Sequence, residues 1–359
     1  MISKKLNLGL ITSYPTNSGI GVYSNNLYDL ELHSDYFFFN FRNPVYETKE
    51  RYREVRSSLL PRSLAYALSF YFPTNWSKVL ERYNYVHLTS PDFFHLVRNK
   101  KEIIGTLHDA YFLDKKLDRQ LGIKYKTVLN YDSEFVSELL GITAVSNVTA
   151  QAFKKKFQKI NPKVIHNWTS DIFVSRKKVL ARRKLNIPYG KFMILNVGAN
   201  TQNKNLKFLS TILSKIKREF IFFQLNNDKI TILDSGRRII LQKKIDEYML
   251  SLYYNSADLY ISTSIAEGFN FPIIEAINSD LPVIASDIPI FKEILHNSPY
   301  LLSLDDESRW VANIEEMIVD SSLLSEMQIW YRHNIDDYYR KARAKIDFIN
   351  FYSELGIRL

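Results

Sequence analysis

The sequence predicts an α/β fold made of two Rossmann-like domains, each with a doubly wound parallel sheet. Three observations carry this prediction. The chain has 359 residues, which exceeds one compact core and suits two domains. Short apolar runs alternate with longer amphipathic segments, as in βαβ units. The alternation restarts after a polar, basic stretch at Asn167–Arg183, which we interpret as the linker.

The first half contains six apolar runs of strand length, separated by helical patterns or turns. Predicted strands are Leu6–Thr12, Tyr36–Phe41, Tyr85–Leu88, Ile103–Leu107, Gly141–Val145 and Lys163–Ile165. Predicted helices are Gly21–Leu30, Asp132–Leu139 and Asn147–Phe157. We expect these elements to form an N-terminal domain over residues 1–170.

The second half repeats the pattern, and we expect a C-terminal domain over residues 171–335. Predicted strands are Phe192–Val197, Phe220–Gln224, Arg238–Leu241, Leu259–Thr263 and Pro282–Ala285. A final helix over 336–359 is expected to pack back on the N-terminal domain. Its predicted apolar face consists of Tyr338, Ala342, Ile346, Ile349 and Phe351, which repeat at roughly helical spacing.

Composition excludes several classes of protein and of site. The chain has no cysteine, which excludes disulfides and thiolate metal sites. No apolar run approaches the ~20 residues of a membrane span. The N-terminal stretch MISKKLNLGLITSYP is expected to form a buried strand, because no small-residue cleavage site follows it. A cytoplasmic location is therefore expected.

Charge is unevenly distributed along the chain. Residues 1–170 hold 23 Lys and Arg against 15 Asp and Glu, a net charge of +8 out of +10 for the whole chain. This excess suits either an anionic partner or an ordinary solvated surface. Leu59, Leu60, Leu64, Leu68 and Phe72 share one helical face, near Arg51, Arg53, Arg56 and Arg62. That stretch either rests on an anionic membrane surface at the cytoplasmic face or buries its apolar face in the domain.

The segment EGFNFPIIEA, residues 267–276, places two carboxylates eight positions apart. A strand, LYIST, precedes it, and Pro272 suits the first turn of the helix that follows. Glu267 is then on the loop and Glu275 one turn into the helix, so both can face one crevice. Carboxylates accept hydrogen bonds from vicinal diols, the helix N-terminus favours phosphate, and Gly268 permits close approach. The segment therefore suggests a nucleotide-sugar site.

Several stretches together resemble the retaining glycosyltransferases of family 4, which have the GT-B fold and an E-x7-E signature. EGFNFPIIEA followed by PVIASDIPIFKEIL resembles that signature. SGIGVYSNNL, TLHDAYFLD, AVSNVTAQAF with KVIHNW, NVGANTQNKNL and YNSADLYISTSIAEGF resemble the family's other segments in order and spacing. The likeness covers nearly the whole chain. It implies two domains that face a cleft.

The resemblance also implies roles for individual residues. Glu275 would bind the ribose, Glu267 the donor sugar, and Lys204 the leaving diphosphate, with His108 near the sugar. The further donor-binding residues implied are Gly268, Phe269, Asn270, Phe271, Ile274, Gly198 and Asn200. Gly19, Gly21 and Asp109 would line the acceptor side. The same residues have plainer interpretations: solvated carboxylates, a surface lysine, a capping histidine and a tight turn.

Two departures from the family pattern concern the donor. Ala199 stands where relatives often carry an arginine, so one cation for the diphosphate is missing. Arg237 and Arg238 are candidates to replace it. His166-Asn167-Trp168 stands where the family usually has PNG.

The resemblance therefore implies a retaining, metal-independent glycosyltransferase, and we expect it to move a hexose from a UDP- or GDP-linked donor to a glycan or lipid-linked acceptor. No cofactor, metal ion or nucleic acid is expected. One alternative is a nucleotide-sugar epimerase of the same fold. The other is a non-catalytic scaffold that binds an anionic partner.

Overall fold

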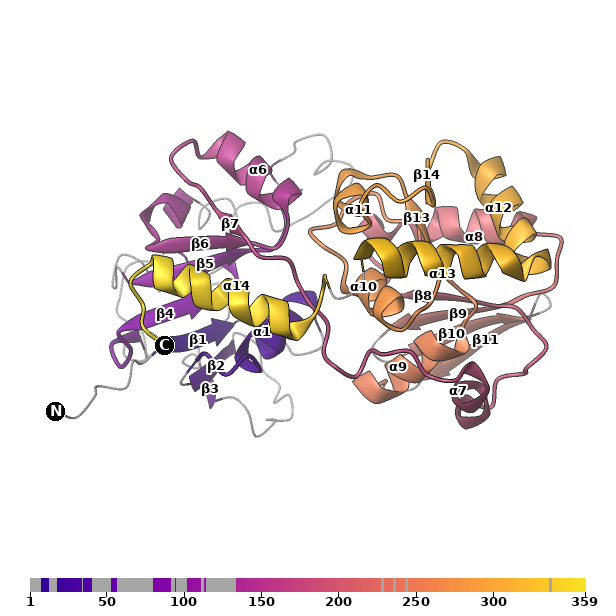
Figure 1. Ribbon diagram of the computed structural model, residues 1–359, viewed down its shortest axis with the longest axis horizontal. Coiled ribbons are helices and arrows are strands. Elements are labelled where there is room, and N and C mark those ends of the chain that lie inside the picture. Colours follow the sequence, from indigo (N-terminus) through magenta and orange to yellow (C-terminus); the bar gives the residue numbers. More distant parts are fainter. Residues whose placement is uncertain are drawn as a thin grey trace. The chain divides into compact units, whose positions relative to one another are not determined.

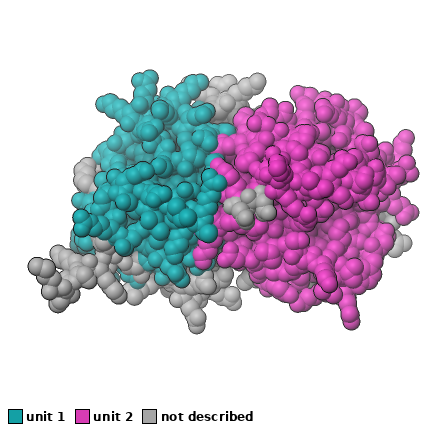
Figure 2. All heavy atoms as spheres, viewed as in Figure 1, with its two compact units in different colours: residues 1–167, 342–359 teal, residues 168–341 magenta. Residues whose placement is uncertain are grey.

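The chain forms two compact units, coloured separately in Figure 2: unit 1, residues 1–167 and 342–359, and unit 2, residues 168–341. The sequence predicts the corresponding borders after residues 170 and 335. The computed structural model describes residues 8–12, 18–33, 35–40, 53–56, 80–91, 94, 102–110, 113, 134–226, 229–234, 237–242, 245–335 and 338–359. The predicted basic amphipathic stretch around Leu59–Phe72 lies outside these residues.

Unit 1 is built from parallel strands and the helices that connect them. Its elements are β1 (Leu8–Thr12), α1 (Gly19–Tyr28), β2 (Asp35–Asn40), β3 (Arg53–Arg56), β4 (Tyr85–Leu88), β5 (Ile103–Leu107), a 3₁₀ helix η3 (Glu134–Glu138), β6 (Gly141–Ala144), α6 (Asn147–Lys156), β7 (Lys163–Val164) and α14 (Lys341–Glu354). The predicted strands and helices are present, with two differences. The helix expected at Asp132–Leu139 is the shorter η3, and β3 was not predicted.

Within the described residues, the seven strands of unit 1 form one sheet in the order β3-β2-β1-β4-β5-β6-β7, and every neighbouring pair is parallel. The order reverses between β1 and β4. In a doubly wound sheet such a reversal opens a crevice at the carboxyl ends of the two strands. Gly19 and His108 follow β1 and β5 in the chain, so they lie at this edge.

The final helix α14 crosses the sheet of unit 1, as Figure 1 shows, and a buried polar network fixes it there. The Tyr352 hydroxyl bonds His87 Nδ1 at 2.7 Å and His33 Nε2 at 2.9 Å, and His87 Nε2 bonds Thr106 Oγ1 at 2.7 Å. Burial lowers the pKa of His33 to about 3, so its ring is neutral at pH 7.

The predicted apolar face of α14 is wrong. Of its five residues only Phe351 is buried, whereas Ile346 is 59% exposed and Ile349 is 40% exposed. The buried face instead carries Ala344, Phe348, Phe351 and Tyr352. The polar network explains the difference, because Tyr352 must point inward to reach the two histidines.

Unit 2 begins with a helix inside the stretch that was predicted to be a linker. Its elements are α7 (Lys178–Leu185), β8 (Met193–Val197), a 3₁₀ helix η4 (Gln202–Lys204), α8 (Leu206–Lys215), β9 (Ile221–Asn226), β10 (Lys229–Asp234), β11 (Arg237–Gln242), α9 (Glu247–Ser256), β12 (Leu259–Ser262), α10 (Phe271–Asn278), β13 (Val283–Ser286), α11 (Pro289–Ile294), β14 (Leu301–Leu302), α12 (Glu307–Val319) and α13 (Ser321–Ile335).

The described strands of unit 2 also form one sheet, in the order β11-β10-β9-β8-β12-β13-β14, with helices on both faces (Figure 1). Four neighbouring pairs are parallel, but β9, β10 and β11 form an antiparallel meander. The expected alternation of strand and helix is therefore wrong between β9 and β11. The order reverses between β8 and β12, which makes their carboxyl ends the expected ligand edge.

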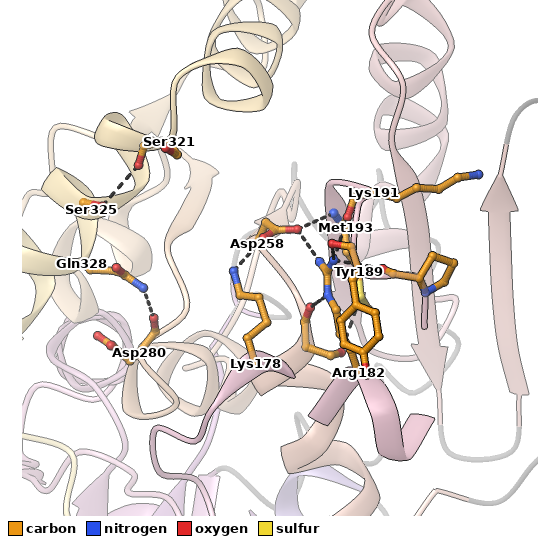
Figure 3. Close-up of polar contacts among 12 residues, drawn as sticks. Lys178, Arg182, Tyr189, Lys191, Met193, Asp258, Asp280, Ser321, Ser325 and Gln328 are labelled. Atoms are coloured by element: carbon orange, nitrogen blue, oxygen red, sulfur yellow. Dashed lines mark hydrogen bonds and ion pairs between the residues drawn. The ribbon is translucent and has the colours of Figure 1, made fainter. Parts of the chain in front are cut away.

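A buried arginine ties together the amino ends of β8 and β12, opposite the expected ligand edge (Figure 3). Arg182, on α7, is 3% exposed. Its guanidinium donates to the carbonyls of Pro188, Tyr189, Lys191 and Ser256 at 2.8–3.1 Å, and to Asp258 Oδ2 at 2.6 Å. Asp258 Oδ2 also accepts from the Met193 N–H at 2.7 Å, so the starts of β8 and β12 are tied together.

Candidate functional site

Two loops at the carboxyl ends of β8 and β12 are joined by hydrogen bonds. The Ile265 N–H donates to the Asn203 carbonyl at 2.8 Å, and Asn203 Nδ2 donates to the Ala266 carbonyl at 3.1 Å. Thr263 Oγ1 donates to the Lys204 carbonyl at 3.2 Å. These contacts bring the η4 segment beside the loop that carries Glu267, as expected at a reversal of strand order.

Lys204 and Glu267 form an ion pair where these loops meet. Lys204 Nζ lies 2.8 Å from Glu267 Oε1, and the two side chains are 18% and 10% exposed. Ser264 Oγ donates to the same oxygen at 2.7 Å. The Ser264 carbonyl in turn accepts from the Ser286 hydroxyl at the end of β13. These hydrogen bonds fix the position of the pair. Lys204 and Ser264 both contact Oε1 of Glu267.

Gly198 makes room for the lysine at the end of β8. Its φ is +145°, which L side chains rarely adopt, and a Cβ there would lie 3.3 Å from Lys204 Cε. Its carbonyl accepts from Gln224 Nε2 at 2.9 Å. The neighbouring Ala199 and Asn200 are exposed. The glycine thus lets the lysine side chain lie across the backbone.

Glu275 lies one turn into α10 and is only 7% exposed. Tyr254, on α9, donates its hydroxyl to Glu275 Oε2 at 2.7 Å. Burial raises the pKa of Glu275 to about 7, opposed by the Tyr254 hydrogen bond and by the charge of Lys204. The carboxyl thus changes charge near neutral pH, in the same part of unit 2 as the Lys204–Glu267 pair.

Glu275→Gln is expected to stabilise the protein at alkaline pH. Between pH 4.5 and about 7 the folded chain keeps a proton on Glu275 that the unfolded chain releases, so this group lowers the free energy of unfolding as pH rises. A neutral glutamine removes the effect and still accepts from Tyr254. We expect a gain of about 3 kcal/mol at pH 8 and little change at pH 4.

Urea unfolding of both proteins at pH 4, 6 and 8 measures this difference. Glu219→Gln, at an exposed glutamate of the same unit, is the control. A gain for Glu275→Gln that did not depend on pH would contradict the expectation.

The first turn of helix α10 has few free backbone N–H groups. Pro272 has no N–H, and the Ile273 N–H donates to the Asn270 carbonyl at 3.3 Å. Fewer backbone N–H groups are therefore available to bind phosphates at this helix end than expected. The preceding turn is packed tightly: Phe269 is 4% exposed, with its ring 5.6 Å from that of Tyr339, and Ile274 has no exposed surface. Ile274 is therefore packed inside unit 2 with its backbone as well as its side chain.

The far end of α10 is fixed by α13. Gln328 Nε2 donates to the Asp280 carbonyl at 2.8 Å, as Figure 3 shows, and Arg332 forms a bidentate ion pair with the Asp280 carboxylate. Asp280 has a positive φ of 62°. The helix that carries Glu275 is thus held at both ends.

In unit 1, the predicted acceptor-side residues lie near the start of α1 and after β5. Ser18 caps α1 by accepting from the Gly21 N–H at 3.0 Å. Gly19 is exposed, and a Cβ there would meet no atom within 4 Å, while Gly21 is buried. Asp109 is half-buried. Gly19 therefore borders open space, as a substrate contact requires.

His108 is 9% exposed and already uses one ring nitrogen. Nε2 lies 2.7 Å from the Thr89 carbonyl, so this nitrogen donates, and Tyr23 packs edge-on against the ring at 4.7 Å. Burial lowers the pKa of His108 to about 4. At pH 7 the ring is neutral, which leaves Nδ1 as the nitrogen for any ligand.

Sequence reasoning missed the residues that support the two glutamates. Tyr254 and Ser264 were inside the quoted segments but received no role, because a hydrogen bond to a residue 21 positions away has no sequence signal. Ser264 is the more predictable, as a hydroxyl three residues from Glu267 on a loop. The side chains of Arg237 and Arg238, offered as replacement cations, lie outside the described residues.

Part of this unit is similar to a known protein family. Residues 191–320, which include Lys204, Glu267 and Glu275, match the family described as Glycosyl transferases group 1. The O-antigen chain mannosyltransferase RfbU of Salmonella typhimurium is 44% identical over 71 residues, 19% of this chain and 20% of that protein. The serotype-specific mannosyltransferase WbdA of Escherichia coli is 41% identical over 78 residues, 22% of this chain and 9% of that protein. The matches thus span only small parts of these relatives.

Solved structures match over nearly the whole chain. Sucrose-phosphate synthase from Thermosynechococcus elongatus has a TM-score of 0.76 at 16% identity, over 98% of this chain and 99% of that chain. HepE from Anabaena, in complex with UDP and glucose, has a TM-score of 0.75 at 13% identity, over 97% and 100%. With two doubly wound sheets, these matches confirm the predicted GT-B fold class. In the described part of the chain, no helix combines the length and apolarity of a membrane span, and no group of three His, Asp or Glu side chains is arranged to hold a metal ion.

Proposed function

We propose that the protein is a retaining glycosyltransferase that moves a hexose from a nucleotide-sugar to a glycan or lipid-linked acceptor. The observation that carries the proposal is the Lys204–Glu267 pair at the carboxyl ends of β8 and β12, with Glu275 buried one turn into the next helix. Two carboxylates and one cation suit a ligand that has two sets of hydroxyls and one diphosphate.

Each charged group has one role in this proposal. Glu275 accepts from the ribose diol, and Glu267 accepts from hydroxyls of the donor sugar. Lys204 neutralises the diphosphate as the bond from the anomeric carbon to the phosphate oxygen breaks and the electron pair leaves with the diphosphate. The acceptor hydroxyl oxygen forms the new bond to the anomeric carbon on the same face of the sugar, and its proton passes to the departing diphosphate. No metal ion is needed for these steps, so activity is expected to survive EDTA.

Lys204 and Glu267 carry opposite charges and contact each other. In this proposal they act on the donor only after the donor has separated them. Lys204 is paired with Glu267, and in this proposal the diphosphate binds the ammonium in place of the carboxylate while sugar hydroxyls bind the carboxylate. His108 is proposed to contact the sugar through Nδ1 as a neutral ring. Its lowered pKa supports a hydrogen-bonding role in place of a cationic one.

The donor sugar and the acceptor are proposed from the named relatives. RfbU and WbdA are mannosyltransferases, and the name of RfbU places it on an O-antigen chain, so we propose mannose and a surface-polysaccharide precursor. A lipid-linked precursor would bring the protein to the cytoplasmic face of a membrane. HepE was solved in complex with UDP, so UDP is tested together with GDP as the nucleotide of the donor.

A panel of nucleoside diphosphates tests the donor site. We expect UDP or GDP to raise the melting temperature, since a ligand at 100 times its Kd adds about 2.7 kcal/mol to the free energy of unfolding. ADP serves as the comparison. If none of the three shifts the transition, the chain is a scaffold and the proposal fails.

Incubation with donor alone separates transfer from epimerisation. The proposed transferase releases at most slow hydrolysis products without acceptor, whereas an epimerase converts the donor sugar to its isomer. NMR of the product formed with acceptor then reports the anomeric configuration. An inverted linkage would contradict the retaining mechanism.

A further inference from the structure

The buried side chain of Asn270, at the N-cap of α10, has an oxygen with nothing to bond. Asn270 is 7% exposed, and its Oδ1 atom is buried without a hydrogen-bond partner among the described residues. A buried carboxamide oxygen without a donor costs stability, so native proteins rarely keep one without a use. The residue lies three positions after Glu267, on the same loop.

The local backbone explains why this oxygen finds no donor in its own helix. An N-cap asparagine normally accepts from the N–H of the second or third helical residue. Here the second residue is Pro272, which has no N–H, and the Ile273 N–H is bonded to the Asn270 carbonyl at 3.3 Å. Asn270 makes no side-chain cap bond. The usual reason for an asparagine at this position is therefore absent.

The backbone of Asn270 also adopts a conformation that an L residue rarely takes. Its φ is +92° and its ψ is +81°, in the region that favours glycine. Glycine would relieve both the backbone strain and the unpaired oxygen. Strained residues of this kind concentrate at ligand sites, where the surrounding structure holds them in place. Two separate costs, one of the backbone and one of the side chain, thus fall on one residue of the loop that carries Glu267.

We infer that Asn270 determines specificity for the donor sugar, with Oδ1 accepting a hydrogen bond from one of its hydroxyls. The inference rests on the proposed function, and it adds a contact of this chain's own side chain. The ligand group must be a donor, because Oδ1 only accepts. A diphosphate carries no proton to give at neutral pH, which excludes it as the partner.

The position of Asn270 favours the transferred sugar over the ribose. Glu275 is five residues further along, about 7.5 Å at the ~1.5 Å rise of a helix. Glu267, the proposed sugar ligand, is on the same loop as Asn270. A hydroxyl held between the Glu267 carboxylate and the Asn270 carboxamide would need the correct orientation at its carbon. Sugars that differ at that carbon would be bound less tightly.

Asn270→Gly provides the test, because its backbone suits glycine and the variant should fold. Calorimetric titration compares UDP, GDP, UDP-glucose and GDP-mannose on both proteins. We expect the affinity for the nucleotide-sugar to fall about tenfold and the affinity for its nucleoside diphosphate to stay unchanged. Asn186→Gly is the control: it has a positive φ of 55° at the exposed end of α7. It should alter neither affinity.

Deoxy donors identify the hydroxyl and separate a ligand contact from a structural effect. Removing the contacted hydroxyl should weaken binding to the wild type and cause no further loss in Asn270→Gly, as in a double-mutant cycle. Equal losses for the nucleotide and the nucleotide-sugar, additive losses for every deoxy donor, or no change at all would overturn the inference. If the wild type binds none of the four probes, the proposed function fails instead.

Discussion

Replacing Arg182 with leucine is expected to destabilise the protein by about 3–5 kcal/mol, the largest effect on stability predicted here. The guanidinium is almost fully buried and donates to four carbonyls and one carboxylate. Leucine fills similar space but leaves those acceptors without a donor. It also leaves Asp258, whose side chain is 15% exposed, with Lys178 as its remaining cation.

Urea unfolding of the variant measures this loss, and two further variants define its cause. Arg183→Leu removes the neighbouring arginine, which is exposed, and should change the free energy of unfolding by less than about 0.5 kcal/mol. Arg182→Lys keeps the charge but lacks the planar fork, so most of the loss should remain. If Arg182→Leu lost less than about 1 kcal/mol, the network would not hold the sheet edge as described.

The largest expected effect on activity is that of Glu267→Gln, which should lower the turnover number by about 10²–10³-fold. Glutamine still accepts from Ser264, so the loop should keep its shape. It cannot pair with Lys204 or hold donor hydroxyls as a carboxylate does. Affinity for the nucleoside diphosphate should change little, because Glu275 and Lys204 remain.

Steady-state kinetics and titration with UDP or GDP separate these two effects. Lys204→Met should behave differently, with weaker binding of the diphosphate as well as slower transfer. Glu219→Gln, at an exposed glutamate, should match the wild type. Full activity in Glu267→Gln would show that the carboxylate has no part in transfer.

The sequence predicted the elements of unit 2 around the site because their signals are local. An apolar strand, a glycine-containing loop and a proline-led helix are each visible in a window of ten residues. The contact between Lys204 and Glu267 is different: it depends on the order of strands in the sheet, which places β8 beside β12. Without the structure, only the resemblance to a known family assigned these two residues to one site.

Errors arose where tertiary contacts override local pattern. The face of α14 was assigned from Ile346 and Ile349, yet both are exposed because Tyr352 bonds two buried histidines. The meander β9-β10-β11 was missed because Lys229–Asp234, which forms β10 and pairs antiparallel with both β9 and β11, was not predicted as a strand. The resemblance implied that Asn270 binds the donor, but not the role of its side chain, since its positive φ and its unpaired oxygen appear only in three dimensions.

The contact of Lys204 with Glu267 also has a consequence for small anions of the cell. If inorganic phosphate bound the Lys204 ammonium, the buried Glu267 carboxylate would keep the Ser264 hydroxyl as its partner among the described residues. Phosphate has no diol that could donate hydrogen bonds to this carboxylate in place of the lysine. A nucleotide-sugar supplies both replacements in one molecule. The ammonium and the carboxylate thereby neutralise each other, and background electrolytes gain little from binding beside them. Transfer activity should accordingly resist inhibition by millimolar phosphate.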